Sequence, residues 1–116
     1  MARYRLSNPA EEDLVAILAV SLERWGEDRR RRYAALIVAA MRAIAADPTA
    51  PTTRARSEVS AGLHSVHLRP VRDDQGVKDP VHVIYYRVRA SVIEIVRVLH
   101  ERMEPTERIA PRARRS

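Results

Sequence analysis

Cysteine is absent from this 116-residue chain. Disulfides and thiolate chemistry are therefore excluded, which suits a reducing compartment such as the cytoplasm. Long apolar runs are also absent, because none approaches the roughly 20 residues that cross a bilayer. The first residues lack the apolar stretch and small-residue cleavage site of a secretion signal. We therefore expect a cytoplasmic protein that makes no contact with a membrane.

Lysine is nearly absent, since Lys78 is the only lysine among 21 basic residues. A GC-rich genome explains this bias as readily as selection for bidentate arginine contacts does. The formal net charge is +6, and most of it belongs to residues 54–116, which hold 13 basic and eight acidic side chains. The positive electrostatic field of this half favours an acidic partner, either nucleic acid or an acidic protein segment.

Glycine is scarce as well, and the three glycines are scattered along the chain at Gly26, Gly62 and Gly76. No glycine-rich loop that binds phosphate can be built from them. The histidines do not form a metal-binding pattern: His64 and His67 face opposite ways on one predicted strand, and His82 lies on another. We expect neither a metal nor a cofactor.

Two amphipathic helices are predicted, over residues 9–24 and 28–46. Asn8 can cap the first helix, and Glu11 three residues later completes a capping-box pattern. Asp28 can cap the second helix. Because only a few residues separate the two helices, they should form an antiparallel hairpin.

The apolar residues of the first helix recur at three- and four-residue steps and form one stripe: Leu14, Ile17, Leu18, Leu22 and Trp25. We expect Trp25 and Tyr33 to lie at the hairpin turn and to seal it, with their rings against this stripe. The arginine run at 29–32 covers nearly a full turn and should be mostly solvated surface.

Four strands are predicted, at residues 3–6, 63–69, 81–88 and 92–99. The three residues "RAS" between the last two are few enough to demand an antiparallel hairpin. Residues 48–62 form a surface loop, and residues 70–80 should protrude.

The element order is thus β-α-α-β-β-β. This order predicts an α+β fold in which the helical hairpin packs on one face of a curved antiparallel sheet. A chain of this length forms a single domain, here residues 1–103, followed by a basic and proline-broken tail at 104–116 that should be frayed.

Two arginines interrupt the most apolar strands, Arg87 in the third and Arg97 in the last. Alternation places four residues of the last strand on one face: Ile93, Ile95, Arg97 and Leu99. Both faces of these strands are mostly apolar, yet two helices cover only one face. Loops, the tail or a partner must cover the other face. The arginines either meet carboxylates of a partner or pair with an acid inside the domain, and the sequence leaves both interpretations open.

The order of elements resembles the RelE/ParE superfamily of bacterial toxin–antitoxin toxins, and the residues match its ParE branch best. The matching segments are "YRLSNPAEEDL", "ERWG", "AADP", "GLHSVHL" and "VIYYRV…IEIVRVLHERM". The resemblance covers roughly residues 4–103. Each motif is weak, but their order and spacing together are specific.

The resemblance implies a toxin that inhibits DNA gyrase without enzyme chemistry of its own. It also implies neutralisation by a cognate ParD-like antitoxin with a ribbon-helix-helix domain, in a hetero-oligomer. That antitoxin would make the DNA contacts, so this chain would meet DNA only indirectly. The antitoxin segment that covers this domain should be acidic, amphipathic and disordered when free.

Candidate contact residues fall into two sets. For the target we assign Arg87, Arg97, His100 and Arg102. For the antitoxin we assign Arg69, Val83, Tyr85, Trp25 and Tyr33. The sequence does not decide which sheet face the helices cover.

The alternative is the RelE branch, whose members cut mRNA on the ribosome. Such cleavage needs cations for the phosphate's developing charge and a group that moves the 2′-OH proton. The chain has suitable residues in Arg69, Arg87, Arg97, His100 and Arg102. However, a basic residue of that branch aligns with Val83, and no tyrosine follows Met103. His100, just past a strand, is more typical of a hydrogen-bonding terminator than of a general base.

Direct DNA binding through the basic second half is a third interpretation. The sequence has no recognition-helix signature and no aromatic platform for stacking bases. Positive charge alone does not separate this interpretation from binding to an antitoxin or to gyrase.

Overall fold

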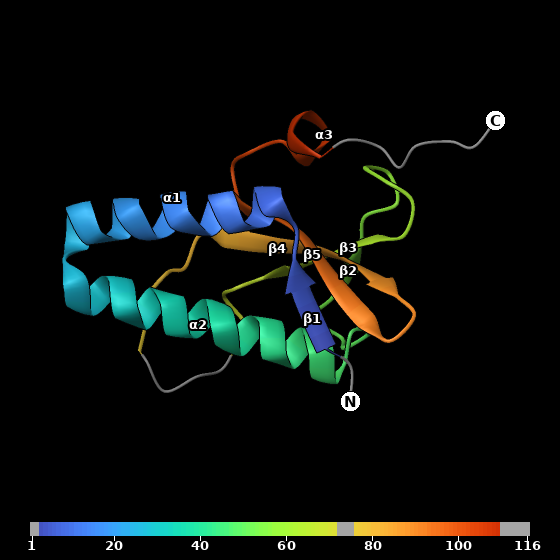
Figure 1. Cartoon of the computed structure of the whole chain (residues 1–116), viewed down its shortest axis with the longest axis horizontal. Helices are drawn as coiled ribbons and strands as arrows, with labels where there is room; N and C mark the ends of the chain where they lie inside the picture. Colours follow the sequence, from blue (N-terminus) through green and yellow to red (C-terminus); the bar gives the residue numbers. More distant parts are fainter. Residues whose placement is uncertain (1–2, 72–75, 110–116) are drawn as a thin grey trace.

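The computed structural model describes residues 3–71 and 76–109. Its elements are β1 (Arg3–Leu6), α1 (Asn8–Trp25), α2 (Glu27–Ala46), β2 (Arg54–Ala55), β3 (Leu63–His67), β4 (His82–Arg89), β5 (Val92–His100) and α3 (Pro105–Arg108). Figure 1 shows α1 and α2 side by side as an antiparallel hairpin against the sheet. The predicted α+β fold is confirmed, and the four predicted strands and two long helices are present within about two residues of their expected ends.

The five strands lie in the order β1-β5-β4-β3-β2. Strands β3, β4 and β5 pair antiparallel, as predicted, and β2 adds a further antiparallel pair with β3. Strand β1, however, runs parallel to β5, with Arg3 opposite Val92 and Leu6 opposite Ile95. The prediction of a wholly antiparallel sheet is therefore wrong for this one pair. No tight turn joins β1 to β5, so only tertiary packing sets their relative direction. Strand β2 was missed because two residues are too few to show alternation.

The predicted hairpin between β4 and β5 is confirmed, with Arg89 opposite Val92 across the turn. The described parts of the 70–80 loop lie close to the domain, since Val71 and Val77 pack against the core. The prediction that residues 70–80 protrude can be followed only at residues 70–71 and 76–80, because residues 72–75 lie outside the described part of the chain.

Both predicted helix caps are wrong by one or two residues. Ser7, rather than Asn8, caps α1: its Oγ accepts a hydrogen bond from the Ala10 N–H at 3.1 Å. The same hydroxyl donates to the carbonyl of Val96 at 2.8 Å, which ties the start of α1 to β5. Gly26 stands between the helices with φ 90°, a conformation that favours glycine, and Asp28 lies inside the first turn of α2.

The sheet carries an apolar cluster on each face. The helix-side cluster joins α2 to the sheet through Leu36, Ile37, Met41, Ile84, Tyr86, Ile93 and Ile95, among others. The far-side cluster consists of Val59, Leu63, Tyr85, Leu99 and Ile109, with Val83 and Val96 packed against it. The chain thus covers part of its second sheet face itself, with a loop residue, Val59, and a residue after α3, Ile109.

A β-bulge at Val96 changes which residues of β5 share a face. Ile95 and Arg97 lie opposite consecutive residues of β4, so Val96 between them has no opposite residue. Ile93 and Ile95 belong to the helix-side cluster, whereas Leu99 belongs to the far-side cluster. The prediction of one shared face therefore fails after Ile95, because alternation within one strand cannot reveal an extra residue.

Trp25 does not seal the helical turn. Tyr33 is 5% exposed and belongs to the core, as predicted, but Trp25 is 66% exposed. The stripe of α1 is covered near its start, where Leu14 and Ile17 pack against the core, and is bare near its end, where Leu22 is exposed. The α1–α2 turn lies at one end of the molecule's long axis (Figure 1).

The beginning of the predicted tail is folded rather than frayed. Residues Pro105–Arg108 form the short helix α3, and Pro105 and Ile109 are buried. The fraying predicted for residues 110–116 concerns positions outside the described residues. Ile109 is the residue from which this packing could have been predicted, because an isoleucine within a basic segment usually packs against other apolar side chains.

Candidate functional site

Arg87 is held inside the domain. It is 9% exposed. Its Nε donates to the carbonyl of Ala61 at 3.5 Å, and its Nη2 donates to Ser60 Oγ. The loop before β3 therefore satisfies part of the guanidinium with neutral oxygens. A buried charge of this kind needs such hydrogen bonds to offset its desolvation.

Arg97 pairs with an acid of α1. Its Nε and Nη2 donate to the two carboxylate oxygens of Asp13 at 2.7 and 2.8 Å, a bidentate ion pair. Asp13 also accepts the backbone N–H of Val98 at 3.0 Å. Arg97 Nη1 donates to the carbonyl of Arg108 at 2.7 Å. For Arg97 the structure shows the internal pairing, and this one side chain links β5, α1 and α3.

Two histidines end strands in the same way. His67 ends β3 and its Nδ1 accepts the N–H of Arg69 at 2.9 Å. His100 ends β5 and its Nδ1 accepts the N–H of Arg102 at 3.1 Å. Nδ1 therefore lacks a proton in both rings, and Nε2 carries one. The interpretation of His100 as a hydrogen-bonding terminator is confirmed by this geometry.

Three rings connect α2 with the ends of β4 and β5. Tyr33 Oη lies 2.6 Å from His82 Nδ1 and accepts the N–H of Val81 at 3.2 Å. We assign the His82 tautomer in which the phenol donates to Nδ1, because this gives the phenol proton an acceptor. The rings of His82 and His100 lie edge to face, with centroids 5.6 Å apart. Burial, together with the neighbouring His100, lowers the pKa of His82 to about 4. His82 is thus a neutral imidazole at physiological pH.

These rings form part of a groove of about 450 Å³ between the end of α1, the start of α2 and the ends of β4 and β5. Its apolar wall includes Ile17, Val20, Trp25 and Met103, and the last three are among the exposed large apolar side chains. Such contiguous apolar exposure is typical of an interaction site.

The charged residues that line this groove are mostly basic. Arg24 and Arg29 line it, together with Asp79 as the acid. The Arg29 guanidinium lies over the Trp25 ring, 5.8 Å from its centroid, and donates to the carbonyl of Lys78 at 3.2 Å. The arginine thereby contacts the indole that lines the groove. A ligand with apolar and acidic groups fits these walls.

The residues predicted to contact the antitoxin do not form one surface. Trp25 and Tyr33 line the groove, whereas Val83 and Tyr85 pack in the far-side cluster. Arg69 lies at the end of β3, where it pairs with Glu101 at 3.3 Å. Among the predicted target contacts, His100 also lines the groove. Arg102, two residues after His100 in the sequence, is exposed.

The sequence did not reveal three of the groove's residues. Val20 lies outside the predicted stripe of α1, and Met103 lies after the last strand. For His82, alternation within one strand gives no sign that its ring meets His100 across the β4–β5 pair. A weak signal for Val20 exists, because an apolar residue on the expected solvent side of an amphipathic helix is unusual.

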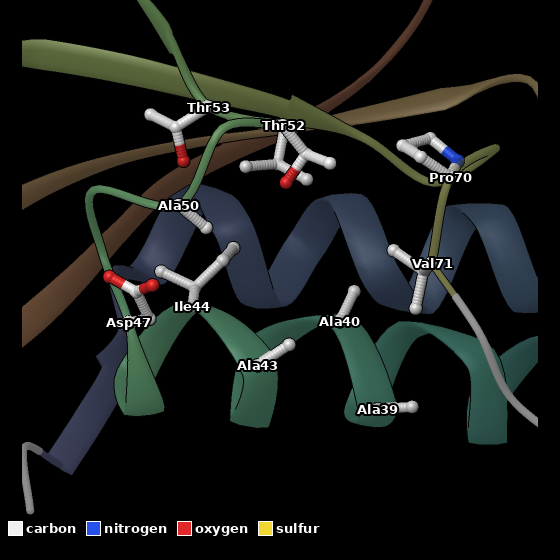
Figure 2. A pocket seen from close by; sticks show the side chains of 11 residues that line it. Ala39, Ala40, Ala43, Ile44, Asp47, Ala50, Thr52, Thr53, Pro70 and Val71 are labelled. Carbon is white, nitrogen blue, oxygen red and sulfur yellow. The ribbon is translucent and has the colours of Figure 1, made fainter.

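A second pocket, of about 260 Å³, lies at the C-terminal half of α2. Figure 2 shows Ala40, Ala43 and Ile44 of α2 facing the loop residues Ala50 and Thr52. Its walls are mainly methyl groups, and the Tyr86 hydroxyl nearby is already bonded to the Pro48 carbonyl and Thr53 Oγ1. This pocket offers little to orient a polar ligand.

Within residues 3–71 and 76–109, no three histidine or acidic side chains are placed to hold a metal ion together. Over the same part of the chain, no helix is long and apolar enough to cross a membrane.

Comparison with known proteins places this geometry in a family. Residues 4–105 match the family described as ParE toxin of type II toxin-antitoxin system, parDE. The Toxin ParE1 of Mycobacterium tuberculosis (strain CDC 1551 / Oshkosh) is 31% identical over 104 residues, which cover 89% of this chain and 93% of that toxin. The Toxin ParE1 of Caulobacter vibrioides is 33% identical over 103 residues, with the same coverage.

A solved structure shows the same fold. A chain from the chromosomal ParDE TA system of P. aeruginosa superposes with a TM-score of 0.63 at 17% identity, covering 86% of this chain and 96% of that one. The sequence matches decide the family, and the resemblance found from the sequence motifs is confirmed. The chain belongs to the ParE toxins of type II toxin–antitoxin systems, and such a toxin has an antitoxin as its partner.

Proposed function

We propose that this toxin acts in the cytoplasm by binding and inhibiting DNA gyrase, and that a ParD-like ribbon-helix-helix antitoxin neutralises it in a hetero-oligomer. Support comes from the family match, which spans residues 4–105. The observation in the structure that carries the proposal is the exposed apolar groove between α1 and the strand ends, since it is suited to binding a protein.

The hydrogen bonds of three histidines favour binding over catalysis. A general base needs an unprotonated nitrogen that faces the substrate. In His67 and His100 that nitrogen already accepts a backbone N–H, and in His82 it accepts the Tyr33 hydroxyl. None of the three presents a ready base. The fourth histidine, His64, has an Nδ1 without a hydrogen-bond partner among the described residues, but that atom is buried and faces no substrate. These observations favour the proposal that the toxin acts by binding.

The groove is the proposed antitoxin site. Its exposed Val20, Trp25 and Met103 offer apolar contacts, and Arg24 and Arg29 offer charge to an acidic segment. We therefore assign an acidic, amphipathic segment of the antitoxin to this groove, with its apolar side chains on Trp25. Because His100 lines the same groove, this segment would cover one of the proposed gyrase contacts, and neutralisation would follow from that overlap.

Gyrase inhibition is tested with purified toxin and gyrase in a supercoiling reaction that contains no ribosomes. We expect inhibition or trapped cleaved DNA, and we expect the His100→Gln variant to keep most of this effect, since glutamine retains a hydrogen-bond acceptor. A general acid–base group would lose about 10²–10⁴-fold on removal. Ribosome-dependent mRNA cleavage that disappears in His100→Gln, with gyrase unaffected, would instead support the RelE-like ribonuclease.

Antitoxin binding is tested through Trp25, the only tryptophan of the chain. Its emission should shift to shorter wavelength when a tryptophan-free antitoxin covers the exposed ring. Val20→Asp should weaken the complex by 10-fold or more, whereas the matched Val15→Asp, on an exposed part of α1 outside this groove, should have little effect. A complex that forms with unchanged Trp25 emission would move the antitoxin to another surface and leave the toxin assignment intact.

A further inference from the structure

A set of arginines gathers on the sheet face that points away from the helices. In β1, Tyr4 and Leu6 pack toward the helix-side cluster, so Arg3 and Arg5 point to the far side. Residues directly opposite one another share a face. Arg3 lies opposite Val92, which lies opposite Arg89, and so Arg89 is on the far side too.

One further residue completes this surface. Glu94 of β5 lies opposite Arg5, and β5 stands between β1 and β4. We call these residues the arginine face: Arg3, Arg5, Arg89 and Glu94. The three neighbouring strands that carry them, spaced about 4.8 Å apart, span roughly 10 Å. Arg54 on β2 is not part of this face, because Ser65, Tyr85 and Arg87 between them are buried.

The charges on the arginine face are poorly balanced. Glu94 is shared by Arg5, at 3.9 Å, and Arg89, at 3.3 Å, so one carboxylate offsets at most one of two guanidiniums. The side chains of Arg5 and Arg89 remain 66% and 47% exposed. On α2, Asp28 is likewise shared by two arginines, Arg31 and Arg32, at 2.6 and 2.8 Å, so a pair with the same charge balance lies on a helix away from this sheet face.

The arginine face is also polar. The one apolar residue among its members is Val92, which is half-buried between Arg3 and Arg89. The exposed Val88 next to Arg89 lies opposite Ile93 on the helix side. Protein–protein interfaces have an apolar centre, whereas interfaces with nucleic acid are more polar and positively charged. Guanidinium groups match phosphate oxygens in a bidentate manner. The ligand class that fits is therefore a polyphosphate backbone.

We propose that the arginine face binds the phosphate backbone of duplex DNA directly and without sequence preference. Such binding needs neither a recognition helix nor an aromatic stacking platform, because phosphate contacts position a protein without reading bases. The β4–β5 turn beside Arg89 and the α1–α2 turn beside the groove lie at opposite ends of the long axis (Figure 1). The same chain can thus hold DNA at one end and an antitoxin at the other.

The test measures binding of the purified toxin, without antitoxin or gyrase, to a fluorescently labelled duplex over a range of salt concentrations. The logarithm of the binding constant should fall linearly with the logarithm of salt, by about 0.9 per phosphate contacted. The double variant Arg5→Gln/Arg89→Gln should bind more weakly and lower this slope by about 2. Glu94→Gln should bind DNA more tightly, since it removes the carboxylate that competes with phosphate.

The matched control is Arg31→Gln/Arg32→Gln, which removes the same charge from α2, where Asp28 is likewise shared by both residues. We expect its slope to equal that of the unchanged protein. Equal losses in the two double variants would show a diffuse effect of net charge and overturn the proposal. Duplex binding unchanged in Arg5→Gln/Arg89→Gln, with antitoxin affinity reduced, would assign the face to an acidic protein instead. Circular dichroism confirms that each variant is folded.

Discussion

Helices α1 and α2 have similar lengths, 18 and 20 residues, and both carry apolar residues at three- and four-residue steps. The two helices are nevertheless buried very differently. Seven residues of α2 are buried, whereas α1 buries only Ala10 and Ser21. The exposed apolar side chains of α1 are Val15, Val20, Leu22 and Trp25. Helix α2 therefore belongs to the core, and α1 is a partly covered element whose outer apolar surface is available to a partner.

The largest loss of stability is expected from truncation inside α2. Met41 is 2% exposed and is among the largest fully buried side chains of the helix-side cluster. Met41→Ala should lower the free energy of unfolding by about 2–5 kcal/mol, because it removes apolar contacts and leaves a cavity. The measurement is urea unfolding followed by circular dichroism. Val38→Ala, on the exposed side of the same helix, is the control and should change little.

The next largest effect should come from the ion pair that attaches α1 to β5. Asp13→Asn replaces the carboxylate that accepts two hydrogen bonds from Arg97 with a neutral amide. We expect a loss of about 1.5–3 kcal/mol, the usual size for hydrogen bonds to a charged group. Glu12→Gln removes the same charge one residue earlier and is the matched control. Equal stability of the unchanged protein and the Asp13→Asn variant in urea unfolding would show that the pair contributes nothing to the attachment of α1.

A third effect is expected from pH. The folded-state pKa of His82, about 4, lies below its unfolded value of 6.5, because burial disfavours the charged ring. Its contribution is therefore fully present above about pH 6.5 and is lost as the pH falls toward 4. Protonation also removes the acceptor of the Tyr33 hydroxyl. Unfolding measured from pH 7.5 to 4 should show a smaller decline in His82→Gln than in the unchanged protein, and parallel curves would contradict this assignment.

The smallest effect is expected for Trp25→Ala at the end of α1. Although tryptophan is usually a core residue, Trp25 is mostly exposed, so its removal should change the free energy of unfolding by less than about 0.5 kcal/mol. Circular dichroism is the suitable probe, because the variant has no tryptophan fluorescence. A loss of several kcal/mol would mean that α1 packs through Trp25 and that the contrast between the two helices is smaller than the structure shows.

The apolar patterns of the sequence were sufficient for most of the fold. Alternation in β4 and β5 and the three- and four-residue steps in α1 and α2 arise within one element, so they can be read from the chain alone. The bulge at Val96 could not, because an extra residue is defined only against a partner strand. The parallel pairing of β1 with β5 could not be predicted for the same reason, since about 90 residues separate the partners.

The candidate site was predicted less well than the fold. The sequence suggested Trp25, Tyr33 and His100 as contact residues, and the structure brings all three to one groove. It left open whether Arg97 pairs with an acid inside the domain and did not point to Asp13 as that acid. It also gave no indication that Val83 and Tyr85 would lie away from this groove, in the far-side cluster. A contact residue is defined by its neighbours in space, and these come from four separate elements.

The sequence by itself determined the α+β class, the helical hairpin, the β4–β5 hairpin and the family, because each rests on local periodicity or on the order of motifs. Only the tertiary structure decided which apolar residues would be left uncovered. Trp25 and Met41 are equally plausible core residues in the sequence, but Met41 packs in the helix-side cluster whereas Trp25 is mostly exposed at the end of α1. Burial depends on what lies opposite a side chain, and that is a property of the packed chain rather than of any one segment.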